Sequence, residues 1–116
     1  MTAIFCTFQV PGFHCWKGAP DDSGYLRDMH RHVFHVRVDC RVSHDNRDVE
    51  FIWFKQFAKS HFESLGARTD LGVKFGEQSC EMLANALRKR LCGCGHLVTR
   101  VEVSEDAENG AIVETG

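Results

Sequence analysis

The sequence predicts an α+β fold in which an antiparallel four-stranded sheet carries two helices on one face. Apolar residues alternate with polar ones near both ends of the chain, whereas the middle repeats them at helical spacing. The expected order is therefore β-β-α-α-β-β, with strands and helices segregated along the chain. With 116 residues, 43% of them hydrophobic and 26% charged, residues 1–116 are expected to form a single domain.

The first strand is expected over Thr2–Phe13, where one side of the alternation is apolar and consists of Ile4, Cys6, Phe8 and Val10. Pro11-Gly12 should bend or bulge this strand. Lys17 to Asp28 is rich in glycine, proline and aspartate, which predicts a loop.

The second strand, Met29–Val42, has one apolar face that begins with His30 and His32. Two imidazoles at positions i and i+2 on one face can converge on one metal ion. Catalytic zinc commonly takes three protein ligands and keeps a fourth position open. The best candidate for the third ligand is His14, at the end of the preceding strand, so the sequence predicts a zinc site of these three histidines.

Two amphipathic helices are expected next. The apolar positions of the first are Phe51, Phe54, Phe57 or Ala58, Phe62 and Leu65, and it should end near Gly66. Residues 67–78 show no clear period and are expected to form a loop. Ser79 is the expected N-cap of the second helix, and the apolar stripe of that helix consists of Met82, Leu83, Ala86, Leu87 and Leu91.

A strand over Leu97–Glu105, a turn over Asp106–Gly110 and a short strand over Ala111–Thr115 are expected to complete the sheet. Glu105 continues the inward phase of Val101 and Val103, so its carboxylate should point toward a pocket. A carboxylate there accepts two parallel hydrogen bonds from an amino-pyrimidinone edge, as it does from guanidinium. This feature favours a pterin-like or purine-like ligand.

The composition and the net charge limit which macromolecular partners and which cellular location are expected. The net charge of −2 indicates neither nucleic acid nor an anionic membrane as a partner. Met1 to Val10 is too polar for a signal peptide, and no apolar run approaches the roughly 18 residues of a membrane span. The six cysteines are interpreted mostly as free thiols. Together these observations indicate the cytoplasm.

The motifs, taken in order, resemble the 6-pyruvoyl-tetrahydropterin synthase / 6-carboxy-tetrahydropterin synthase family, whose fold is the T-fold (tunnelling fold). The shared pattern consists of His14, the pair His30 and His32, the helix entry Val49-Glu50-Phe51, the helix opening Ser79-Cys80-Glu81-Met82-Leu83-Ala84, and Glu105 near the end of its strand. The resemblance implies zinc on the histidines, a pterin held by Glu105 with Glu81 nearby, and a homo-oligomer built from trimers, most simply a hexamer.

The sequence also departs from this family. The family places a cysteine four residues before the His-x-His motif, where this chain has Leu26, and an Asp-His pair between the helices, where it has Asp70 and Leu71. The remaining candidates for a proton-transferring base are Asp28, Cys15, Asp70 and Tyr25. Two functions stay open: a lyase acting on a dihydropterin-type substrate by zinc polarisation, and a catalytically inactive paralogue that binds the heterocycle or serves as an assembly subunit.

Overall fold

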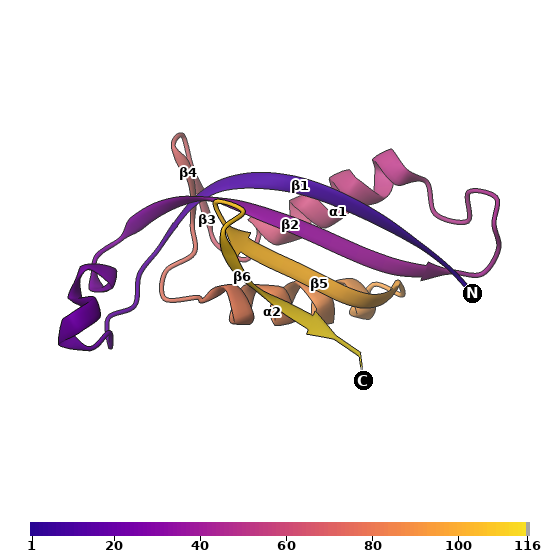
Figure 1. The fold of residues 1–116 in the computed structure, drawn as a ribbon. Helices are drawn as coiled ribbons and strands as arrows, with labels where there is room; N and C mark the ends of the chain where they lie inside the picture. Colours follow the sequence, from indigo (N-terminus) through magenta and orange to yellow (C-terminus); the bar gives the residue numbers. More distant parts are fainter. Residues whose placement is uncertain (116) are drawn as a thin grey trace.

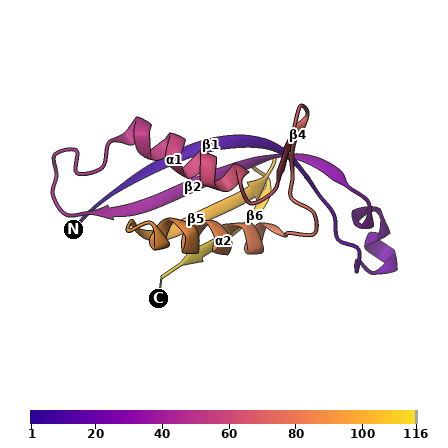
Figure 2. The ribbon, with the colours of Figure 1, turned by 180° about the vertical axis from the view of Figure 1, so that it is seen from behind.

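The computed structural model describes residues 1–115 as a strongly twisted sheet with both helices on one face. The strands are β1 (Thr2–His14), β2 (His30–Val42), β3 (Ala67–Thr69), β4 (Gly72–Lys74), β5 (Leu97–Glu105) and β6 (Asn109–Glu114). The helices are α1 (Phe51–Glu63), α2 (Cys80–Gly93) and the short 3₁₀ helix η1 (Asp21–Arg27). Both α-helices lie behind the sheet in Figure 1 and in front of it in Figure 2. The predicted α+β class and one-sided helix layer are confirmed.

The sheet has six strands in the order β3-β4-β1-β2-β5-β6, so the predicted four-stranded sheet is wrong. It is also mixed, because β4 runs parallel to β1 through Gly12 and Phe13. The two added strands come from the segment expected to be a loop. Each has only three residues, too few to show a period, and Val73 is their only buried member among the described residues. Gly72, at φ 142°, lets this hairpin approach β1, since a Cβ there would lie 2.6 Å from the Pro11 carbonyl oxygen.

The long β1–β2 pair is the frame of the molecule, with one-to-one pairing from Thr2↔Val42 to His14↔His30. The expected bulge at Pro11-Gly12 is absent, and the pairing continues unbroken through both residues. Pro11 is exposed on the edge of β1 before β4 begins to pair, where a missing N–H is tolerated. Gly12 lies beneath two aromatic rings, and a Cβ there would meet Phe75 and Phe34 at 2.8 and 2.9 Å.

The core lies between the sheet and the helices. Its largest fully buried members are Val10 of β1, Phe34, Val36 and Val38 of β2, Phe54 and Phe62 of α1, Leu83, Leu87 and Leu91 of α2, and Val98, Val101 and Val103 of β5. The expected positions Phe51, Met82 and Leu97 are instead 63%, 58% and 67% exposed. For Leu97 the reason is a register shift opposite Asp39 and Cys40, which turns Val98 inward in its place.

Both helices begin at side-chain caps. Ser79 accepts a hydrogen bond from the Met82 amide, as predicted, and the Glu50 carboxylate accepts from the amides of Ile52 and Trp53. These amide bonds hold the pKa of Glu50 below its ordinary value. The Ser79 cap matters most for the site, because it fixes the start of α2 beside the ends of β1 and β5.

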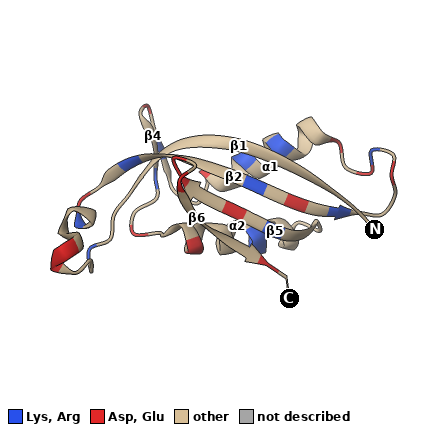
Figure 3. Ribbon diagram, viewed as in Figure 1, with Lys and Arg blue, Asp and Glu red and all other residues tan. Residues whose placement is uncertain are grey.

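The opposite face of the sheet carries charges of both signs along β2 and β5 (Figure 3). Arg37 contacts Asp39 at 2.8 Å, and Arg100 contacts Glu102 at 3.1 Å and Glu114 at 3.2 Å. This alternation of apolar and charged faces is the pattern that the sequence predicts for β2. None of the helices in the described residues is long and apolar enough to cross a membrane.

Candidate metal centre

Three histidines meet where β1 ends and β2 begins. His14 and His30 are direct partners across the strand pair, and His32 follows two residues along the same face of β2. The ring centroids lie 4.6 Å apart for His14 and His30, 5.2 Å for His14 and His32, and 5.0 Å for His30 and His32. One nitrogen from each ring can be chosen so that the three nitrogens lie within 4.8 Å of one another. The predicted grouping of these histidines is confirmed, and the cluster could hold a metal ion.

In each of the three rings, Nδ1 makes a hydrogen bond with an oxygen that can only be the acceptor. The acceptors are the Gln78 carbonyl for His14 at 3.0 Å, the Asp28 carbonyl for His30 at 2.9 Å, and the Asp106 carboxylate for His32 at 2.7 Å. Each Nδ1 must therefore carry the proton, which leaves the lone pair of the neutral ring on Nε2. Metal-binding histidines are held in this way by partners on their second nitrogen.

The Nε2 atoms are left without a conventional partner. Those of His14 and His32 are buried and make no hydrogen bond within the described residues. Burial is the main reason why the pKa of His14 lies below its ordinary value, so the neutral, metal-binding form is favoured. Buried polar atoms need partners, and two aligned lone pairs suit a cation. The residues present thus fit a zinc ion.

Glu105 faces the same point from the neighbouring strand. Its carboxylate oxygens lie 3.0 Å from Nε2 of His14 and 3.5 Å from Nε2 of His32. Its position is fixed by pairing with Phe34, whose ring packs edge-on against His14 and His32. A carboxylate so close to two nitrogen lone pairs requires positive charge among them, either a proton or a metal ion.

A cavity of about 500 Å³ opens beside the cluster, within the roughly 300–1,000 Å³ range of small-molecule sites. Its lining comes from the ends of β1 and β5, the starts of β2, β6 and α2, and the segments that follow β1 and precede α2. The residues named from the sequence as site residues, or as a replaced site residue, that line it are His14, His30, Cys15, Glu81, Glu105 and Leu26. These six are therefore brought together, although they come from positions 14 to 105 of the chain.

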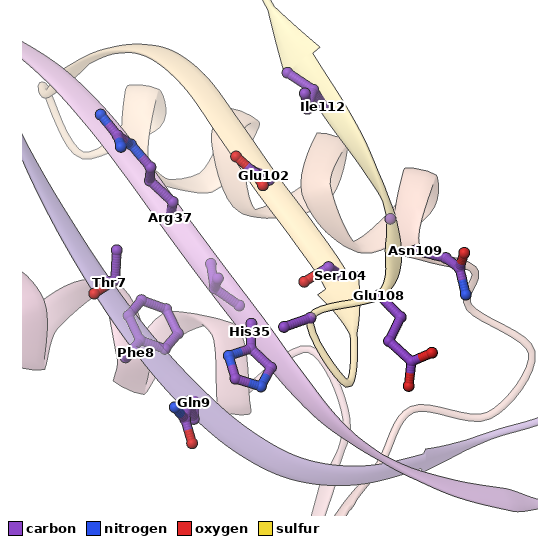
Figure 4. Close-up of a pocket in the computed structure, with 13 residues that line it drawn as sticks. Thr7, Phe8, Gln9, His35, Arg37, Glu102, Ser104, Glu108, Asn109 and Ile112 are labelled. Carbon is purple, nitrogen blue, oxygen red and sulfur yellow. The ribbon is translucent and has the colours of Figure 1, made fainter.

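A second hollow has a different chemistry. It has a volume of about 530 Å³, lies on the charged face of the sheet (Figure 4) and is bordered by Gln9, His35, Arg37, Glu102 and Ser104. Its single histidine is on the opposite face of β2 from His30 and His32, as the strand alternation predicts. We therefore identify the histidine cavity as the candidate site because possible metal ligands converge there, and not because of its volume.

Solved structures match the chain, and two of them illustrate a match along nearly its whole length. An uncharacterized protein from Wolinella succinogenes superposes with a TM-score of 0.62 at 17% identity, covering 99% of this chain and 98% of that one. The 6-pyruvoyl tetrahydropterin synthase of Caenorhabditis elegans superposes with a TM-score of 0.61 at 10% identity, covering 99% and 96%. The chain has the T-fold. No family model and no curated protein sequence matches it.

Within this T-fold, the predicted bases lie in different surroundings. Cys15 is buried and lines the cavity, because the chain leaves β1 after His14 and its amide donates to the Gly76 carbonyl. Asp28 reaches His30 through its backbone carbonyl, and its side chain is exposed. Tyr25 in η1 is 76% exposed. Asp70 and Leu71 form the exposed turn of the β3–β4 hairpin and do not line the cavity.

Sequence reasoning missed three residues at this centre: Gln78, Cys80 and Asp106. The Gln78 carbonyl orients His14, and the Asp106 carboxylate orients His32. The Cys80 thiol lies 3.9 Å from a Glu105 oxygen, and burial raises its pKa to about 12, with Glu105 adding to the effect. No spacing rule joins positions 78 and 14 or 106 and 32, so only the folded chain shows these contacts.

Proposed function

We propose that this chain is a zinc-binding T-fold protein that acts as a lyase on a dihydropterin-type substrate. The observation that carries the proposal is the convergence of three oriented Nε2 lone pairs at the mouth of a cavity that also contains Glu105. Three nitrogen ligands with one open position favour zinc. The matched synthase from Caenorhabditis elegans supports the pterin-like chemistry.

In this proposal the histidines would hold zinc, which when bound polarises an oxygen of the substrate and makes its protons more acidic. To bind the ion, the imidazole rings must stay neutral and keep their orientation, and the three Nδ1 hydrogen bonds hold them in this state. Cys15 is the best-placed of the proposed bases, since it lines the cavity next to His14. Asp28 and Asp70 are exposed and would need a movement, or a neighbouring subunit, to reach the substrate.

Glu105 is the proposed anchor for the heterocycle, with Glu81 at the rim of the same cavity. A pterin ring offers two parallel N–H donors that match a carboxylate, and charge-assisted hydrogen bonds contribute about 1.5–3 kcal/mol each. Glu105→Gln keeps the size of the side chain but replaces one acceptor with a donor. We expect this change to weaken pterin binding by roughly tenfold or more.

The measurement is calorimetric titration of neopterin into zinc-loaded protein. Glu108→Gln is the matched control, because Glu108 is an exposed carboxylate in the turn that follows β5. The control should bind as the unmodified protein does. Equal affinities for the Glu105 variant and the unmodified protein would remove the main support for a pterin-like ligand.

The alternative is a catalytically inactive paralogue that binds the heterocycle or serves as an assembly subunit. One observation favours it: Leu26 lines the cavity, so an inert side chain occupies the region from which the family's cysteine would act. Cys80 does not replace a base readily, because its raised pKa keeps the thiol protonated. Binding of neopterin together with no product from any dihydropterin, and not only from 7,8-dihydroneopterin triphosphate, would favour this alternative.

A ring-shaped homo-oligomer, most simply a hexamer built from trimers, is part of the proposal. The outer edge of β1 pairs with β4 only at Gly12 and Phe13, and β6 pairs only with β5 in the described chain. Long open edges of this kind need a cover, and joining the β1 edge of one copy to the β6 edge of the next would supply one. The six free cysteines agree with the cytoplasm as the proposed location.

We therefore expect light scattering to give a mass of several times 13.2 kDa at micromolar concentration. A second measurement is the replacement of Ile112, on β6, by proline. The Thr115 amide donates to the Thr99 carbonyl of β5, so strand alternation turns the Ile112 N–H outward; the change removes an edge donor and is expected to reduce the mass. A monomeric mass for the unmodified protein would contradict the assembly. In a monomer, Asp70 could also not act as a base in the cavity of a neighbouring subunit.

A further inference from the structure

The β5–β6 turn is tied to β2 by a side chain. Asp106 and Ala107 both have positive φ, 55° and 59°, and the Glu108 amide donates to the Glu105 carbonyl at 3.0 Å, which closes a tight turn. Such turns usually use asparagine or aspartate followed by glycine, so alanine at the second position is costly. The turn is held in this form by contacts outside the hairpin.

Three hydrogen bonds supply those contacts. The Asp106 amide donates to the Val33 carbonyl at 2.8 Å, and one carboxylate oxygen accepts from the Val33 amide at 2.8 Å. The second carboxylate oxygen accepts from Nδ1 of His32 at 2.7 Å. Because both oxygens are engaged, the carboxylate cannot rotate away from the imidazole without losing a backbone partner.

His32 differs in this respect from the other two histidines. The Nδ1–H groups of His14 and His30 donate to neutral backbone carbonyls, whereas that of His32 donates to a charged carboxylate. An anionic partner makes the imidazole a stronger electron donor through its second nitrogen and fixes both its tautomer and its ring plane.

We propose that Asp106 is a positioning residue for the metal centre, which holds His32 with its Nε2 lone pair toward the ion and strengthens that bond. The proposal rests on the metal site of the proposed function. It also accounts for the strained turn, since this backbone conformation brings one carboxylate to both Val33 and His32.

The sharpest substitution is Asp106→Asn, which replaces a single carboxylate oxygen by an NH₂ group. An asparagine has one acceptor and one NH₂ donor, so it cannot accept from both the Val33 amide and the His32 Nδ1–H. If its oxygen stays on Val33, its NH₂ group faces Nδ1 and favours the tautomer with the proton on Nε2, which cannot bind the ion through that nitrogen. Asp106→Gly is the second variant, because glycine suits a positive φ and preserves the turn while removing the carboxylate.

The experiment measures zinc affinity by competition with a chromophoric chelator in unmodified protein, both Asp106 variants and the Glu108→Gln control. We expect about 10- to 100-fold weaker zinc binding in both Asp106 variants and no change in the control. Nitrogen-15 spectra of the metal-free protein supply a readout that a purely structural role would not move. His32 should carry its proton on Nδ1 in the unmodified protein and shift toward Nε2 in Asp106→Asn.

The outcomes separate the two proposals. If the unmodified protein binds zinc and both Asp106 variants bind it equally tightly, the role of Asp106 is overturned while the metal site stands. If the unmodified protein takes up no zinc, the metal site fails and the role of Asp106 fails with it. Weaker binding in Asp106→Gly, with thermal unfolding of the metal-free variant unchanged, would support positioning over a general loss of structure.

Discussion

Protein purified from zinc-containing medium is expected to carry about one zinc ion per chain, as a site of three histidines requires. The triple variant His14→Ala, His30→Ala, His32→Ala should carry essentially none. Apparent binding free energies of structural zinc sites reach about 10–16 kcal/mol at neutral pH, so the loss of all ligands removes binding altogether. The measurement is elemental analysis of the purified proteins, with single variants expected to lose most of the metal.

His35→Ala is the matched control for this prediction. His35 lies on the same strand, but it borders the hollow of Figure 4 on the opposite face of the sheet. Its removal should leave the zinc content unchanged, so the control separates the cluster from a general effect of the seven histidines. Full metal occupancy in the triple variant would contradict the site.

The parts of this fold that the sequence predicted well are those with a local period. The alternation along β2 was enough to place His30, His32 and Phe34 on one face, because thirteen residues of strand repeat it several times. Residues 67–74 gave no such signal, since β3 and β4 have three residues each and owe their position to β1. The phase of Leu97 was wrong for a related reason: a bulge depends on the partner strand, and the partner is not visible in a local pattern.

The candidate site was predictable in its ligands but not in what orients them. His14, His30 and His32 were found because residue type and strand phase both mark them. Asp106 sits 74 residues from His32, and its carboxylate role depends on a turn with two positive φ angles. Cys80 is in phase with the buried residues Leu83 and Leu87 of α2, so spacing marks it only as a core position, and its approach to Glu105 depends on the packing of α2 against β5.

The unmodified protein is expected to show little or no release of triphosphate from 7,8-dihydroneopterin triphosphate. A positioned proton-transferring group contributes typically 10²- to 10⁴-fold to a rate. The two such positions of the family hold Leu26, which lines the cavity, and Leu71, which is 74% exposed, and neither side chain can take up a proton. Their loss should thus reduce this reaction by at least about 10²-fold.

Leu26→Cys tests the same idea in the opposite direction. It introduces a thiol at the wall of the cavity, so a measurable gain in triphosphate release or in a new pterin product would show that the missing group limits the reaction. Met29→Cys is the control, because Met29 is 45% exposed and does not line the cavity within the described chain. Robust turnover by the unmodified protein would contradict the prediction. It would indicate that another group has taken over proton transfer, and Cys15→Ser would then identify the first candidate by abolishing the activity.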